Sequence, residues 1–400
     1  MSLMALSLER SKAAPLQLRL TMDDVTPESG FRELMEPYIG NIEILWFAGF
    51  ATTEDLARTL PNFPQSTPNL RSLELSIDGS VPGWEPSIDP FASFPDTLRS
   101  LELIDAPLYP SFLKLRTLTE LSLHFYVIHS SMSTLLDLLE ENRSLESVEI
   151  NISIDEFPAH VSQPRVVTLN QLQRLMIACR DPMIARTMIA SIPLRRGVHL
   201  GLELREEDSN FTLNSILSGI SMSHLSNLSS PTFMEYQSSP AMTRLVGPNG
   251  SLSYKRDCFP SYGEGFPTLP VADIKELHLI YDTYSSRVPH PSSFLALEAL
   301  AIKWAVTDVS RIFSTLFPNP SFFPSLRTLG FLDCNINEGF MEELVRFASD
   351  RKGTTSAWLQ RVVIAHRIGK FPSADLIRRL GEHVPVVDVR VSGTLPTDLV

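Results

Sequence analysis

Apolar residues recur along this chain in one pattern, apolar-x-x-apolar-x-apolar, which constrains the fold more than any other feature. The clearest copy reads Leu326-x-x-Leu329-x-Phe331 and continues to Cys334 and Ile336. Leu329 and Phe331 are two residues apart, so they lie on the same face of a strand. Further copies, the first six of them 20 to 31 residues apart, start at Ile39, Leu70, Leu98, Leu118, Leu145, Leu172, Ile274, Leu297 and Leu359.

A strand, a corner and a helix repeated about every 20–29 residues are the pattern of a leucine-rich repeat. One such unit cannot bury its apolar side alone, so consecutive units stack into a solenoid. We therefore predict an α/β fold: a curved leucine-rich-repeat solenoid of irregular repeats, with parallel strands on the concave face and helices and loops on the convex face. The clearest helices are predicted over 131–141 and 182–191.

The repeats fall into two halves, separated by a stretch that lacks the pattern. Residues 1–27 are predicted to form an N-terminal cap, and residues 28–204 the first half of the repeats. Residues 205–270 are rich in Ser, Pro and Gly, so we expect an irregular insertion or a divergent repeat there. Within it, 247–250 is a turn signal with short strands on either side. Residues 271–400 are predicted to hold the second half of the repeats and a C-terminal cap.

Composition argues against several classes of partner and location. The net charge is −12, and no run rich in Lys or Arg overrides it, so binding to nucleic acid or to an anionic membrane is not predicted. The three cysteines are widely separated, which indicates neither a disulfide framework nor a zinc site and is typical of a reducing compartment. Since neither a signal peptide nor a membrane-spanning stretch is found, we expect a cytoplasmic or nuclear location.

The sequence contains no motif that indicates catalysis. H-x-x-x-H, G-x-S-x-G and P-loop patterns do not occur. His124 and His129 are five residues apart, which is the wrong spacing for a pair of metal ligands on a helix. We therefore predict no catalytic residue, no cofactor and no metal, and expect that the protein is not an enzyme. Cys334 is interpreted as a buried structural thiol.

One position in each strand, between its second and third apolar residues, faces the open concave side. Adjacent strands lie about 4.8 Å apart, so these side chains form a row. The row is mostly acidic in the first half, which suits a basic segment of a partner; alternatively, it is only the polar exterior of a sheet. In the second half Ala301, Gly330 and Val363 continue it, and we expect a neutral to basic surface. The predicted partner-binding residues are Glu43, Glu74, Glu102, Ser122, Glu149, Met176, His278, Lys303 and Arg361.

The repeat that contains Cys334 resembles the cysteine-containing repeats of ribonuclease-inhibitor-like and F-box/leucine-rich-repeat proteins. Through LERSKAAPLQLRL (8–20), GPNGSLSY (247–254) and FPSLRTLGFLDCNI (323–336), the whole chain resembles the fungal F-box-like proteins with degenerate leucine-rich repeats. The resemblance implies a substrate receptor of a ubiquitin ligase, docked on a Skp1-type adaptor by an F-box that precedes the segment matching 8–20. We find no L-P-x-E start of an F-box and expect the F-box to be missing here.

Two functions follow as hypotheses. The first is a protein–protein interaction scaffold that binds a partner on its concave face and is related to F-box substrate receptors. Binding of a Skp1-type adaptor is not expected without the F-box. The alternative is a structural or regulatory leucine-rich-repeat protein, ribonuclease-inhibitor-like or GTPase-activator-like, with no ubiquitin link.

Overall fold

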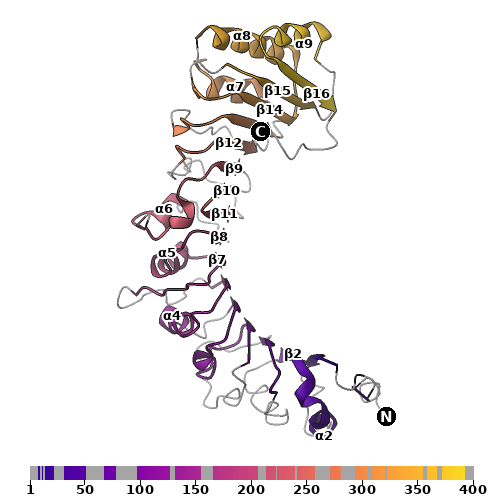
Figure 1. Ribbon diagram of the computed structural model, residues 1–400, viewed down its shortest axis with the longest axis vertical. Coiled ribbons are helices and arrows are strands. Elements are labelled where there is room, and N and C mark those ends of the chain that lie inside the picture. The colour runs from indigo at the N-terminus through magenta and orange to yellow at the C-terminus, as the bar shows by residue number, and fades with distance from the viewer. Residues whose placement is uncertain are drawn as a thin grey trace. The chain divides into compact units, whose positions relative to one another are not determined.

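The computed structural model is an α/β fold built on a mostly parallel sheet. It describes residues 8–9, 11, 14–21, 31–50, 67–77, 97–126, 131–154, 165–205, 213–221, 223–238, 241–256, 271–280, 293–303, 309–319, 322–354, 358–366 and 372–391. The chain divides into two compact units, Met1–Gly201 and Leu202–Val400. Figure 1 labels many of their helices and strands.

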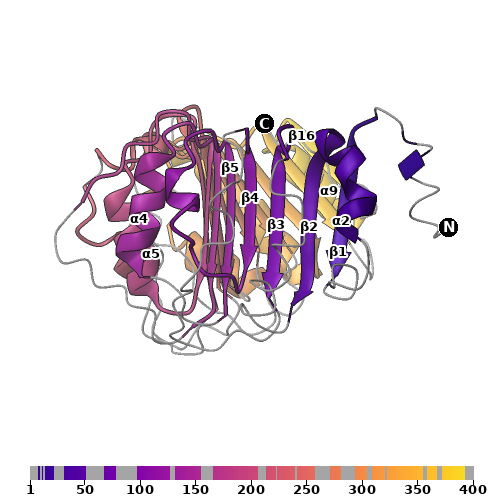
Figure 2. The same ribbon diagram turned by 90° about the horizontal axis from the view of Figure 1, so that it is seen from below.

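The first unit is a series of strands in the order of the sequence, and those from β1 to β7 pair in parallel with their neighbours. The strands are β1 (Leu16–Thr21), β2 (Ile42–Phe50), β3 (Ser72–Ile77), β4 (Ser100–Ile104), β5 (Glu120–Phe125), β6 (Ser147–Ile152), β7 (Arg174–Cys179) and β8 (His199–Leu204). The last of these contains the boundary between the units. Figure 2 shows β1 to β5 side by side.

Alternate side chains of these strands are buried. In β3, Leu73, Leu75 and Ile77 are buried, whereas the residues between them, among them Glu74, are partly exposed. We call the side of the buried residues the core face and the other side the open face. Burying a Leu side chain contributes about 1.5–3 kcal/mol, and the neighbouring strands supply that burial.

A ladder of backbone hydrogen bonds precedes the strands and holds their register. The ladder runs through Arg71, Arg99, Thr119, Glu146, Gln173 and His199. From Arg99 on, the amide of each residue donates to the carbonyl of the residue before it in this series, at 2.7–2.8 Å. Hydroxyl groups beside it add further bonds: Thr117 Oγ1 donates to Leu98 O at 2.7 Å, and Ser144 Oγ to Leu118 O at 2.8 Å. These bonds satisfy polar backbone groups at the start of an otherwise apolar layer.

Two helices of the first unit confirm the predicted spans. Helix α4 (Met132–Glu141) starts after Ser131, whose Oγ accepts from the Thr134 amide at 3.2 Å, and α5 (Pro182–Ser191) starts after Asp181, which accepts from the Met183 amide at 2.8 Å. Figure 2 shows both helices next to the strands. The other helical pieces are α2 (Phe31–Met35), η3 (Glu36–Asn41) and η5 (Phe112–Lys114).

The second unit contains three antiparallel strands before the parallel pattern resumes. The antiparallel strands are β9 (Phe233–Ser238), β10 (Ala241–Gly247) and β11 (Gly250–Arg256); the parallel ones are β12 (Glu276–Ile280), β13 (Ala299–Lys303), β14 (Thr328–Cys334), β15 (Arg361–His366) and β16 (Val386–Val391). The order is β11-β10-β9-β12, then β13 to β16 in sequence, so β9 pairs in parallel with β12.

The antiparallel strands lie inside the segment 205–270, for which we expected irregular structure. The two strands predicted around the turn at 247–250 are confirmed as β10 and β11, whereas β9 was not predicted. Gly247 is required at the turn because a Cβ there would lie 2.9 Å from Pro231 Cα and from Ser230 O. Residues 206–212 and 257–270 lie outside the described ranges.

Phenylalanine side chains join the helices of the second unit to its strands. Its helical pieces are α6 (Leu213–Leu217), η6 (Ser226–Leu228), α7 (Val309–Leu316), α8 (Glu338–Thr354) and α9 (Ala374–Gly381). The ring centroid of Phe313 on α7 lies 4.8 Å from that of Phe317 and 6.1 Å from that of Phe331 on β14. It lies 5.5 and 5.2 Å from the ring centroids of Phe340 and Phe347 on α8. Such aromatic pairs contribute about 0.5–1.5 kcal/mol each beyond their burial.

Arg351 on α8 is fully buried and binds the turn before β14. Its guanidinium donates to the carbonyls of Phe322, Phe323 and Leu326 at 2.9, 2.6 and 3.1 Å. Burial lowers the pKa of Arg351 to about 10, which still leaves it charged at neutral pH. One side chain therefore satisfies three carbonyls at the junction of the helix and the strand.

We predict that Arg351→Met lowers the free energy of unfolding by about 2–4 kcal/mol, because three carbonyls lose their donor inside the protein. Arg346→Met, at an exposed position of the same helix, is the control and should change it by less than about 0.5 kcal/mol. Urea unfolding measures both. Equal effects of the two substitutions would contradict this role for Arg351.

Candidate functional site

Most of the predicted row in the first unit is confirmed by the strand register. Glu74 pairs with Glu102, Glu102 with Ser122, Ser122 with Glu149 and Glu149 with Met176. All five side chains are partly exposed on the open face. The row therefore carries three carboxylates across four consecutive strands.

The assignment of Glu43 to this row is wrong. The strand predicted from Ile39 begins three residues later, because η3 occupies 36–41. Trp46 pairs with Glu74 and holds the row position in β2. Glu43 instead lies before the row, where its carbonyl accepts from the Arg71 amide at 2.8 Å. The core-face residues of β2 are Ile42, Leu45 and Phe47.

Glu102 lies at the centre of unfavourable charge interactions. Its pKa is raised, first by partial burial and then by the carboxylate of Glu74; His124 opposes the shift, and Glu149 adds to it. Within the described part of the chain, Glu102 forms an ion pair with His124 at 3.7 Å, and no Lys or Arg pairs with Glu74, Glu102 or Glu149. These carboxylates would gain from a cation supplied from outside.

His124 lies in a set of hydrogen bonds beside Glu102. Its Nε2 is 2.9 Å from Ser122 Oγ, and its Nδ1 is 3.3 Å from Asn151 Nδ2. Asn151 Oδ1 accepts from Ser153 Oγ at 3.2 Å. In a catalytic triad the serine and the carboxylate bind opposite ring nitrogens, whereas here Ser122 and Glu102 both lie at Nε2. The set orients polar groups on the face but lacks triad geometry.

In the second unit the row has the predicted register but not the predicted surface. His278 pairs with Ala301, Ala301 with Gly330 and Gly330 with Val363. Ala301 and Val363 are completely buried, and they cluster with Leu332 and Ala365 on the same face. The neutral to basic surface expected there is therefore wrong at these positions, which belong to an apolar core.

Of the two basic residues predicted for the second unit, Lys303 forms an ion pair and Arg361 lies at the edge of the row. Lys303 Nζ lies 3.2 Å from Glu235 Oε2, and its side chain is only 15% exposed. Glu235 was missed because β9 was not predicted. Arg361 pairs in register with Thr328 and Val386 at the edge of the row and is partly exposed.

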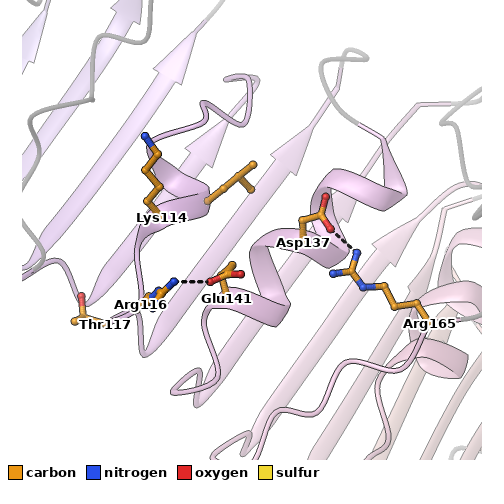
Figure 3. Close-up of a pocket in the computed structure, with 7 residues that line it drawn as sticks. Lys114, Arg116, Thr117, Asp137, Glu141 and Arg165 are labelled. Carbon is orange, nitrogen blue, oxygen red and sulfur yellow. Dashed lines mark hydrogen bonds and ion pairs between the residues drawn. The ribbon is translucent and has the colours of Figure 1, made fainter.

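A pocket of about 710 Å³ lies between η5 and α4 (Figure 3). Arg116 Nη2 is 3.4 Å from Glu141 Oε2, and Arg165 forms ion pairs with Asp137 and Glu140, which raise its pKa. The lining of the pocket carries three positive and two negative side chains, and Glu140, bound to Arg165, supplies a third carboxylate, so no strong excess of either charge remains. The pocket is lined by Leu113, Lys114, Arg116, Thr117, Asp137, Glu141 and Arg165.

Within the described ranges, no group of three or more His, Cys, Asp or Glu side chains could hold a metal ion. No helix described by the structure is long and apolar enough to cross a membrane. Cys334, predicted to be buried, is 1% exposed, and its Sγ lies 3.3 Å from Ile302 O.

We predict that Glu102→Gln stabilises the protein at pH 7.5 by a few tenths to about 1 kcal/mol, because it removes a charge that burial and Glu74 disfavour. Since the folded-state pKa is raised, wild type loses stability as the pH rises through 4.5 toward that value, and the gain should vanish below pH 4.5. Urea unfolding at several pH values measures it.

The matched control is Glu120→Gln, on the same face but paired in register with Ser100 and Ser147. Glu74→Gln with Glu102→Gln should gain less than the two single changes together, because each relieves the same repulsion. Additive gains, or an equal gain from Glu120→Gln, would contradict the electrostatic account.

Comparison of the chain with protein-family models and with curated proteins finds no match. What the open face binds therefore has to be inferred from its own geometry and charge.

Proposed function

We propose that this protein is a leucine-rich-repeat solenoid that binds another protein through the open face of its first unit. The partner presents an extended segment rich in Lys or Arg. The observation that carries the proposal is the row of Glu74, Glu102 and Glu149, which have no Lys or Arg partner among the described residues and of which Glu102 has a raised pKa.

The geometry of the row supports an extended ligand. Adjacent strands are about 4.8 Å apart, so the carboxylates of Glu74 and Glu102 stand one strand apart and Glu149 two strands beyond. A chain crossing the strands can place cationic side chains at this spacing. Trp46, next to Glu74 in the row, offers an aromatic face on which a guanidinium or ammonium can lie. Binding of this kind weakens as salt concentration rises.

The repeat spacing and the parallel strand order support the leucine-rich-repeat assignment. The resemblance to F-box-like proteins supports a relation to substrate receptors of ubiquitin ligases, with a binding role and not a catalytic one. Stable copurification of the chain with a Skp1-type adaptor would support that relation. Its absence would favour neither candidate, because adaptor binding is not expected without the F-box. The alternative, a ribonuclease-inhibitor-like or GTPase-activator-like protein without a ubiquitin link, uses the same face without the adaptor.

We predict that Glu74→Lys with Glu102→Lys abolishes binding of the partner, because two attractive contacts become repulsive. Pull-down from cell extract, followed by mass spectrometry, compares this variant with wild type and with a control double variant, Glu33→Lys with Glu342→Lys. The control has the same change in net charge at exposed positions on α2 and α8. A protein lost with the open-face variant alone supports the proposal, and an unchanged set of proteins would contradict it.

A further inference from the structure

Four charged side chains meet on the open face of the second unit. His278 Nε2 on β12 lies 2.6 Å from Glu276 Oε1, and His278 Nδ1 lies 3.7 Å from Glu235 Oε2 on β9. Lys303 on β13 reaches past β12 to Glu235 at 3.2 Å. We call Glu235, Glu276, His278 and Lys303 the ionic cluster. Its side chains are only 13–22% exposed, so solvent screens their interactions weakly.

The charge of the ionic cluster depends on His278. With His278 protonated, two cations balance two carboxylates. With His278 neutral, Lys303 still lies beside Glu235, but Glu276 loses the cation at 2.6 Å. Loss of one proton therefore leaves a carboxylate at 22% exposure without its charged neighbour, which is unfavourable.

We propose that the ionic cluster is a pH-responsive lock, in which protonated His278 bridges Glu276 and Glu235 and holds β9 to the parallel strands β12 and β13. Above the pKa of His278 the imidazole is neutral, and its ionic attraction to Glu276 and Glu235 is lost. The open face at these strands then carries one more negative charge, and the pairing of β9 with β12 weakens.

Two carboxylates beside His278 favour its protonated form, and Lys303 opposes it. On its own strand His278 faces Glu276. From β9 it faces Glu235 and Phe233, whose ring centroid lies 4.9 Å from that of the imidazole in a T-shaped arrangement; from β13 it faces Ala301, with Lys303 as the charged group beyond. On β10, Arg244 pairs in register with Glu235 and is exposed. The two carboxylates lie on opposite ring nitrogens, so each stabilises the imidazolium.

The pKa values of the cluster set the pH window. Burial lowers the pKa of His278, but the neighbouring carboxylates of Glu235 and Glu276 outweigh it, and the net shift is upward from 6.5. The neighbouring His278 and Lys303 side chains lower the pKa of Glu235 to about 2, so Glu235 stays ionised throughout. A raised histidine pKa means that the lock is complete below pH 6.5 and is lost as the pH rises through the folded-state value.

NMR titration of the His278 ring in the full chain tests the lock, with His278→Asn assigning the signal. We expect a pKa above 6.5 in wild type and a lower value in Glu276→Gln, which keeps the hydrogen-bonding shape without the charge. His224→Asn, at a partly exposed position in the same unit, controls for removal of a histidine. A His278 pKa at or below 6.5, or one that Glu276→Gln does not lower, would overturn the proposal.

Hydrogen exchange of the β12 amides supplies a second readout. After correction for intrinsic exchange, the opening constant in wild type should rise between pH 6 and pH 9, by up to about tenfold for each unit by which the His278 pKa exceeds 6.5. In His278→Asn this rise should disappear, and in His224→Asn it should remain. An opening constant in wild type that does not change over this range, or the same rise in His278→Asn, would also overturn the lock.

Discussion

The burial of alternate strand residues is the constraint on which the rest of the structure depends. Leu73 and Leu75 of β3 are buried because β2 and β4 lie beside them, and the same holds from strand to strand within each unit. This burial commits one face of each strand to the core. The other face is partly exposed along the row of the first unit, whereas Ala301 and Val363 are buried on it in the second. The ladder of amides before the strands then fixes which residues stand side by side on that other face.

The two units use this open face differently. In the first, Glu74, Glu102 and Glu149 stand in one row without a Lys or Arg partner in the described part of the chain. In the second, the described carboxylate Glu235 is balanced by Lys303 within the protein. A row that is balanced internally gains little from an external cation, whereas a row that repels itself gains more. This contrast is why we assign partner binding to the first unit.

The sequence was sufficient to predict helices where apolar spacing and helix caps agree, as at α4 and α5. It was sufficient to predict strand register where the apolar pattern is unbroken, as from Leu70 to Met176. It failed at Glu43, because Ile39 and Ile42 fit the apolar pattern in two registers and only the pairing with β3 selects one. It missed β9, whose partners β10 and β12 are not both adjacent in sequence. The burial of Ala301 and Val363 could not be predicted from the sequence either, because a residue's position in a strand determines which face it lies on but not whether that face is exposed.

The pKa of the Glu102 carboxyl group is the most direct test of the acidic row, because it reports both the register of the row and the absence of a neutralising cation. Selective carbon-13 labelling of glutamate, with Glu102→Gln to assign the signal, allows the titration in wild type and in Glu74→Gln. We expect a pKa above 4.5 in wild type and a lower value when the charge of Glu74 is removed. A value of 4.5 or lower, or one that Glu74→Gln leaves unchanged, would contradict it.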